Sequence, residues 1–163
     1  MSASKPVVCI VIVNFNGAED TLSCLASLDS IDYLNHFIVV VDNSSDDDSV
    51  SVLKEELSLS HTIDNEHATF ASRSLDNRIH LVESPVNGGF GSGNYIGINF
   101  GLENGADYVL LLNNDTIVED SFLSPLVAHL ESNPDVGIVS GKIQRRYMQT
   151  KSPITPLFSA ACG

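Results

Sequence analysis

A run of apolar and aromatic residues, Tyr108–Leu112, is followed directly by the polar sequence Asn113-Asn114-Asp115-Thr116. Two amides, a carboxylate and a hydroxyl in succession offer the oxygen ligands that Mg²⁺ and Mn²⁺ prefer. Such ions usually need only one or two protein carboxylates when substrate phosphates complete their coordination. Asp115 could therefore hold a cation, with Asn113 assisting directly or through water. A tight turn is the alternative interpretation, because Asn and Asp are common in turns.

A second polar cluster begins at Asp42, directly after the apolar run Phe37–Val41. Asp42 is either the cap of a following helix or a residue at a pocket edge. At a pocket edge it would accept a hydrogen bond from a ribose hydroxyl or from the imide N–H of uracil or thymine, which cytosine lacks. The next acidic run, Asp46-Asp47-Asp48, is interpreted as solvated charge at a helix start rather than as a metal site.

A glycine-rich segment is the third candidate, with Gly88, Gly89, Gly91, Gly93 and Gly97. Its spacing is not GxGxxG, it follows the third predicted strand rather than the first, and it has no Gly-Lys-Ser/Thr phosphate loop. One interpretation is a helix start at which glycines let two backbones approach closely. The other is a loop whose backbone N–H groups, with Asn87 or Asn94, line a sugar-nucleotide pocket.

Strand and helix patterns alternate along the chain, which predicts a doubly wound, mostly parallel α/β sheet. The predicted strands are Val7–Val13, Phe37–Val41, Ile79–Val82, Tyr108–Leu112 and Val136–Val139, and helical spacing covers Asp20–Leu28, Val50–Leu59, the segment after the glycines and Glu119–Leu130. Residues 60–77 show no clean period and are interpreted as a surface insertion. In such sheets, ligands bind beyond the carboxyl ends of the strands. The polar clusters should therefore meet at one edge.

Composition excludes several classes of partner. The chain has 163 residues with 21 acidic and 8 basic side chains, a formal net charge of -13. This balance argues against binding nucleic acid or an anionic membrane surface. A bridging divalent cation would still allow an anionic ligand. No apolar run predicts a membrane span, and three cysteines without close spacing suit a reducing compartment. We expect the cytoplasm, with the inner face of the membrane as an alternative position.

Four segments together resemble, in this order, the N-terminal half of family 2 glycosyltransferases. They are VVCIVIVNFNGAEDTLSCLASL, FIVVVDNSSDDDSV, IHLVESPVNGGFGSGNYIG and YVLLLNNDTIVEDSFLSPLV. The resemblance covers about residues 6–143 apart from the insertion, and the rhamnosyltransferase-like branch is the most similar. It implies a GT-A fold and, with Mg²⁺ or Mn²⁺, inverting transfer of a sugar, rhamnose being one candidate. The donor implied is a dTDP- or UDP-sugar, and the acceptor a glycan or glycolipid.

The resemblance also implies roles for individual residues. Asp42 matches the acidic residue that meets the base, and Asn113-Asn114-Asp115 match the DXD metal motif, with the Asn in first place that is usual in this branch. The implied donor-binding residues are Val13, Asn14, Phe15, Asp42, Asn87, Gly89, Phe90, Asn94, Asn113 and Asn114, and the implied metal ligands are Asp115 and Asn113.

The sequence departs from the family in what it lacks. The catalytic base, an Asp or Glu in the family's second half, has no convincing counterpart here. We interpret residues 1–143 as a nucleotide-sugar-binding half, with the insertion at about 60–77, and residues 144–163 as an irregular tail that begins a missing acceptor half. Whether the chain is itself an enzyme stays open.

Two other functions fit parts of the sequence. A truncated, non-catalytic remnant would bind nucleotide sugar, or a partner protein that supplies the missing half, without turnover. A nucleotidyltransferase would share the sheet and the metal-bound diphosphate. Those enzymes usually have a basic, Gly-rich loop after the first strand, where this chain reads NFNGAED. We rank the nucleotidyltransferase below the other two functions.

Overall fold

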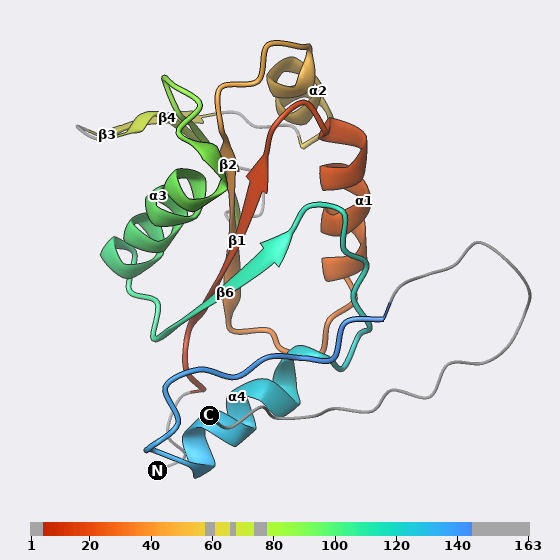
Figure 1. Ribbon diagram of the computed structural model, residues 1–163, viewed down its shortest axis with the longest axis vertical. Coiled ribbons are helices and arrows are strands. Elements are labelled where there is room, and N and C mark those ends of the chain that lie inside the picture. Colours follow the sequence, from red (N-terminus) through yellow and green to blue (C-terminus); the bar gives the residue numbers. More distant parts are fainter. Residues whose placement is uncertain (1–4, 58–60, 66–67, 74–77, 145–163) are drawn as a thin grey trace, which may run out of the picture.

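The fold is a six-stranded sheet with helices on both faces (Figure 1). The computed structural model describes residues 5–57, 61–65, 68–73 and 78–144, so the predicted tail lies outside the described residues except for its first residue. The strand order is β3-β4-β5-β2-β1-β6. The strands are β1 (Val8–Asn14), β2 (His36–Asp42), β3 (His61–Asn65), β4 (Ala68–Arg73), β5 (Ile79–Glu83) and β6 (Tyr108–Asn113).

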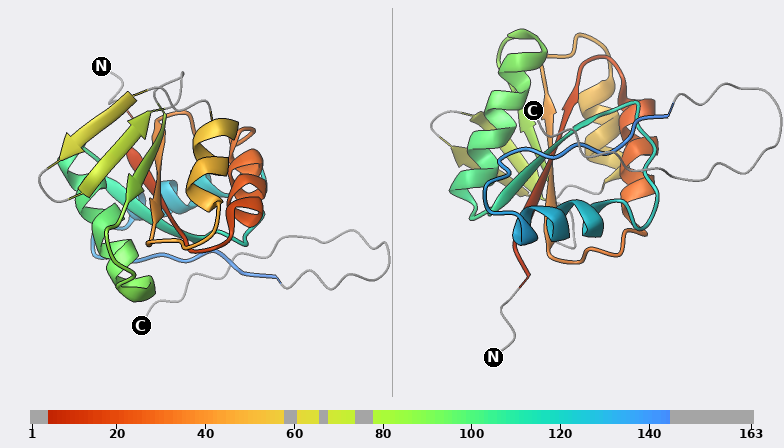
Figure 2. Two further views of the ribbon diagram at one scale, coloured as in Figure 1. Left: turned by 90° about the horizontal axis from the view of Figure 1, so that it is seen from above. Right: turned by 60° about the horizontal axis from the view of Figure 1, so that its bottom comes forward.

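Four adjacent strands, β5, β2, β1 and β6, are parallel to one another. The helices are α1 (Ala18–Leu28), α2 (Ser49–Glu56), α3 (Gly89–Glu103) and α4 (Leu123–Ser132). Figure 2 shows from two further directions that α3 lies across the sheet from α1 and α2. The predicted doubly wound, mostly parallel sheet is confirmed. Among the described residues, no helix combines the length and apolar character that crossing a bilayer requires.

Strand β1 forms the centre of the core, because all seven of its residues are buried. Its side chains alternate between the two faces, as the pleat of a strand requires. Val8, Ile10 and Ile12 pack with residues of α1, α2 and α4, whereas Cys9 and Val11 pack on the α3 side. A strand buried on both faces needs an apolar residue at nearly every position. This need explains the uninterrupted apolar run near the N-terminus.

The register of the parallel strands brings three chain segments to one edge of the sheet. Val13 of β1 lies beside Asn113 of β6, and Asn14 lies beside Asp42 of β2. From β1 the chain continues to β2 on one side, and β6 joins β1 on the other, so the strand order reverses between β1 and β6. Ligands of doubly wound sheets bind in the crevice at such a reversal.

The segment interpreted as an insertion extends the sheet. Strands β3 and β4 pair antiparallel with each other, and β4 pairs antiparallel with β5. Residues 58–60, 66–67 and 74–77 of this region lie outside the described residues. These strands were not predicted, because residues 60–77 show no clean alternation of apolar and polar residues.

Three predicted boundaries are wrong. Val136–Val139 forms no strand: no described strand pairs with it, and Ile138 is 85% exposed. An isolated strand leaves its backbone N–H and C=O groups without hydrogen-bond partners in a sheet, so the extended conformation is not stabilised. Helix α4 begins at Leu123 rather than at residue 119, because Pro125, which lacks an N–H, is tolerated only in the first helical turn. Helix α2 ends at Glu56 rather than at residue 59.

A stripe of glycines lets α3 lie close to β1. A Cβ atom added at Gly93 would stand 2.7 Å from a Val13 methyl group, and one at Gly101 would stand 2.8 Å from the Cys9 sulfur. A Cβ at Gly97 would collide with Val11. These three positions, spaced by four residues, face the same strand. For them the close-packing interpretation holds.

We predict that Gly97→Ala destabilises the protein by about 1–3 kcal/mol, because a buried valine must move to admit the methyl group. Gly91→Ala is the matched control in the same helix, since no heavy atom lies within 4 Å of its added Cβ. That variant should be as stable as the wild type or about 0.5–1 kcal/mol more stable. Urea unfolding measures both. Equal stability of the two variants would contradict close packing at Gly97.

Candidate functional site

The turn after β6 forms part of a pocket. The Thr116 N–H donates to the Asn113 carbonyl at 3.1 Å, so the polar cluster is a tight turn, as one of its two interpretations required. The same turn also lines a cavity of about 360 Å³, together with Val13 of β1 and Phe90 of α3. Asn113, Asn114 and Asp115 form the polar part of the lining. A volume of this size is within the range of small-molecule sites.

The rest of the pocket lining is apolar. Val13 is 9% exposed, whereas Phe90 is 61% exposed on the first turn of α3. Gly89 precedes it with a positive φ of 78°, a conformation that glycine adopts without strain. Phe15, 46% exposed, follows the end of β1. Apolar groups on one side and oxygen atoms on the other suit a ligand with a flat ring and a charged group.

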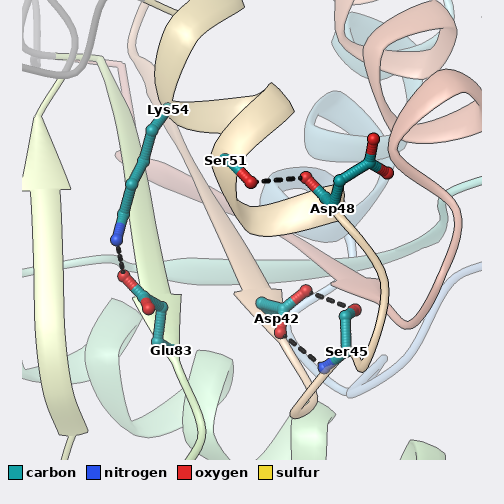
Figure 3. Close-up of polar contacts among 6 residues, drawn as sticks. All are labelled: Asp42, Ser45, Asp48, Ser51, Lys54 and Glu83. Carbon is teal, nitrogen blue, oxygen red and sulfur yellow. Dashed lines mark hydrogen bonds and ion pairs between the residues drawn. The ribbon is translucent and has the colours of Figure 1, made fainter.

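Asp42 lies behind the pocket rather than on its surface. Its side chain is 1% exposed, and both carboxylate oxygens accept hydrogen bonds. The Ser45 N–H donates at 2.9 Å, the Ser45 hydroxyl at 2.6 Å and the Asn14 amide at 2.8 Å (Figure 3 shows the two bonds from Ser45). These bonds satisfy a carboxylate that would be costly to bury without partners.

Asn14 connects Asp42 to the pocket wall through two more residues. The Thr21 hydroxyl donates to Asn14 Oδ1 at 2.8 Å, and the Asn114 amide donates to the Thr21 oxygen at 3.2 Å. We call Asp42, Asn14, Thr21 and Asn114 the buried relay. Three of its members are at most 1% exposed, and Asn114 is half-buried.

Sequence reasoning missed Thr21 and Ser45. A signal for Thr21 was present, because it shares the buried face of α1 with Leu25 and Leu28. A polar residue at an apolar position of a helix needs a partner inside the protein. Ser45 gave no comparable signal within its polar run.

Asn43, the neighbour of Asp42, fixes the other wall. Its amide donates to Asn87 Oδ1 at 2.8 Å, and its own oxygen accepts from the Gly88 N–H at 3.3 Å. Asn87 Oδ1 also accepts from the Gly89 N–H at 2.9 Å. Asn94 donates to the carbonyl of Phe90 at 2.9 Å. Asn87 and Asn94 thus hold the backbone that carries Phe90, and neither lines the cavity.

The acidic run Asp46-Asp47-Asp48 lies exposed before α2, as predicted for charge at a helix start. Hydrogen bonds from Ser49 lower the pKa of Asp47. Asp46 is joined to the loop after β1, because the Asn16 amide donates to its carboxylate at 2.6 Å. Figure 3 also shows the Asp48 carbonyl accepting from the Ser51 hydroxyl.

Cys24 of α1 lies behind the turn after β6. Its sulfur contacts the Asn113 carbonyl at 3.7 Å and is fully buried. Burial raises the pKa of the Cys24 thiol to about 12, and the negative charge of Asp115 acts in the same direction. The thiol is therefore neutral at physiological pH and unsuited to act as a nucleophile or a metal ligand.

The polar wall fits a divalent cation only if the ligand contributes to its coordination. Within the described residues, no cluster of three or more His, Cys, Asp or Glu side chains could hold a metal ion. From the part of the chain that the structure describes, the pocket lining receives one carboxylate, Asp115, two amide groups, Asn113 and Asn114, and no Lys or Arg. Mg²⁺ and Mn²⁺ accept such sparse sets when phosphates supply the remaining oxygens.

Comparison with known proteins relates the chain to one family. The sequence profile described as "Glycosyl transferase family 2" matches residues 9–157. The structure is similar to S. aureus TarS 1-349 in complex with UDP-GlcNAc, with a TM-score of 0.58 and 16% identity over 78% of this chain. It is also similar to mannosyltransferase PcManGT from Pyrobaculum calidifontis in complex with GDP-Man and Mn2+, with a TM-score of 0.59 and 20% identity over 78% of this chain. No curated protein sequence matches.

The chain spans only part of these structures. It covers 32% of that TarS chain, 33% of the PcManGT chain and 20% of a longer TarS structure. At such low identity, the likeness establishes the fold.

We predict that Asp42→Asn destabilises the protein by about 1–3 kcal/mol, because an amide cannot accept all three hydrogen bonds and would set N–H against N–H. Asp135→Asn, which removes an exposed carboxylate after α4, should change stability by less than about 0.5 kcal/mol. Chemical denaturation of both variants checks this. A wild-type unfolding midpoint for Asp42→Asn would show that the relay does not depend on this carboxylate.

Proposed function

Because the chain belongs to glycosyl transferase family 2, we propose that it binds a nucleoside diphosphate sugar in the pocket between β1, β6 and the start of α3. One observation supports this most strongly. Val13, Phe90 and the turn Asn113–Asp115 come from three distant segments and line one cavity where the strand order reverses. The chain would serve as the donor-binding part of a glycosyltransferase of the inverting type.

The two walls would contact different parts of the donor. Val13, Phe15 and Phe90 offer apolar surface for the nucleoside. Asn87, Gly89 and Asn94 do not line the cavity itself; they shape the start of α3 and would border a sugar that extends beyond the cavity.

The polar wall would hold the diphosphate end of the donor. Asp115 would hold a divalent cation, with Asn113 assisting. Among the described residues, no basic side chain lines the wall to neutralise phosphates directly. A bound Mg²⁺ or Mn²⁺ would supply positive charge to the departing diphosphate. Asp115 and Asn113 would keep that charge at the polar wall.

The nucleobase that the pocket would accept depends on Asp42. Uracil and thymine carry the imide N–H that a carboxylate accepts, so dTDP- and UDP-sugars remain our proposed donors. This carboxylate accepts hydrogen bonds from Ser45 and Asn14. Because Asp42 is 1% exposed and does not line the cavity, contact with the nucleobase would require the residues that cover it to move. Rhamnose as the sugar and a glycan or glycolipid as the acceptor rest on the sequence resemblance alone.

Sugar transfer also needs a carboxylate that removes the acceptor's proton. Within the described residues, Asp115 is the one carboxylate lining the cavity, and it is already assigned to the cation. We therefore place the base and the acceptor site in polypeptide outside these residues, in the same protein or a partner. The alternative of a non-catalytic donor-binding chain shares the pocket and differs only in this point.

We predict that UDP and dTDP bind this chain more tightly with Mn²⁺ than with EDTA, and that CDP binds less tightly than either. Asp115→Asn should abolish the gain from Mn²⁺, because among the described residues it removes the one carboxylate that lines the cavity. Asp135→Asn, which removes an exposed carboxylate that does not line the pocket, is the matched control and should keep the gain. Isothermal titration calorimetry measures all three proteins. Equal binding with and without Mn²⁺, or an unchanged gain in Asp115→Asn, would overturn the assignment.

A further inference from the structure

We propose that Thr21 is a positioning residue that turns the Asn114 amide so that its oxygen, not its nitrogen, faces the ligand. This inference rests on the proposed function, because it gives the polar wall its affinity for a cation and a diphosphate. Thr21 lies on α1, is fully buried and does not line the cavity. It acts through Asn114.

The direction of the buried relay follows from chemistry at one end. A carboxylate only accepts hydrogen bonds, so the Asn14 group that contacts Asp42 must be its NH₂. The other end of that amide is then an oxygen, which requires Thr21 to donate its single hydroxyl proton. The Thr21 oxygen is left as an acceptor, and Asn114 must meet it with NH₂.

The orientation of the Asn114 amide also determines which of its atoms faces the cavity. The nitrogen of Asn114 is held by the Thr21 oxygen at 3.2 Å and reaches the Gly17 carbonyl at 3.5 Å. Both contacts lie on the α1 side. Within the described part of the chain, Asn114 Oδ1 accepts no hydrogen bond. Since Asn114 lines the cavity, its oxygen is the end available to a ligand.

The orientation of the Asn114 amide affects how well the polar wall binds a cation. An amide oxygen beside Asp115 adds a second neutral oxygen ligand to the one from Asn113, which strengthens a cation site that has one carboxylate. A flipped amide would instead direct two N–H groups at the cation and repel it. Through the buried relay, the Asp42 carboxylate at the end of β2 therefore determines which atom of the Asn114 amide faces the pocket.

The test compares two substitutions at one position. Thr21→Val keeps the shape of the side chain and removes the hydroxyl, whereas Thr21→Ser keeps the hydroxyl. We expect Thr21→Val to weaken Mn²⁺-dependent UDP binding about five- to tenfold, the value of one hydrogen bond to a partly buried group. Thr21→Ser should bind within about twofold of the wild type. Ser23→Ala, which removes an exposed hydroxyl from the same helix, should bind like the wild type.

A ligand-free measurement separates the relay from the function. In ¹⁵N spectra of the folded, unliganded protein, Thr21→Val should shift the side-chain NH₂ signals of Asn114 and Asn14, and Thr21→Ser should largely restore them. If the wild type binds no nucleoside diphosphate, the proposed function fails, and these signals alone decide whether Thr21 orients Asn114. Unmoved Asn114 signals in Thr21→Val, or equal losses of binding in the Val and Ser variants, would overturn the inference.

Discussion

Hydrogen bonds that end at two adjacent residues, Asp42 and Asn43, fix both walls of the pocket. Asp42 holds Asn14 and, through Thr21, the turn that carries Asn114. Asn43 holds Asn87 and the backbone before Phe90. The two walls come from segments far apart in the sequence, and each would be free to shift without these contacts. Because Asp42, Asn14 and Thr21 are buried and hydrogen-bonded to one another, displacing one of them would leave another unpaired in a medium of low polarity, which is costly.

The sheet and its glycine stripe make this arrangement possible. Parallel pairing in register places the ends of β2, β1 and β6 side by side, so three polar clusters meet at one edge. Gly93, Gly97 and Gly101 let α3 lie directly on β1, which brings Phe90 next to Val13. The apolar core thus determines the separation of the walls, and the hydrogen bonds determine which atoms those walls present. A cation would help a chain with a net charge of -13 to bind an anion, and we propose that Asp115 holds it.

Patterns with a strong physical cause were predictable from sequence. The continuous apolar run of β1 and the polar residues after each strand indicated the sheet and the edge that carries the site. Long-range hydrogen bonds have no local pattern, so the burial of Asp42 and the part played by Thr21 were not foreseen. Strands β3 and β4 were missed for a different reason, because their segment shows no clean alternation of apolar and polar residues. The predicted strand at Val136–Val139 had a suitable composition, but no described strand pairs with it. The roles assigned to individual donor-binding residues stay predictions.

The most direct test is a crystal structure of the chain with UDP and Mn²⁺ bound. Our account predicts one Mn²⁺ ion coordinated by the Asp115 carboxylate and by the diphosphate, with the uracil ring against Val13 and Phe90. The side-chain oxygen of Asn114 should face the ion, and its nitrogen should still contact Thr21. An ion bound instead at Asp46–Asp48, or a nucleotide bound with Asp115 directed into solvent, would contradict the account.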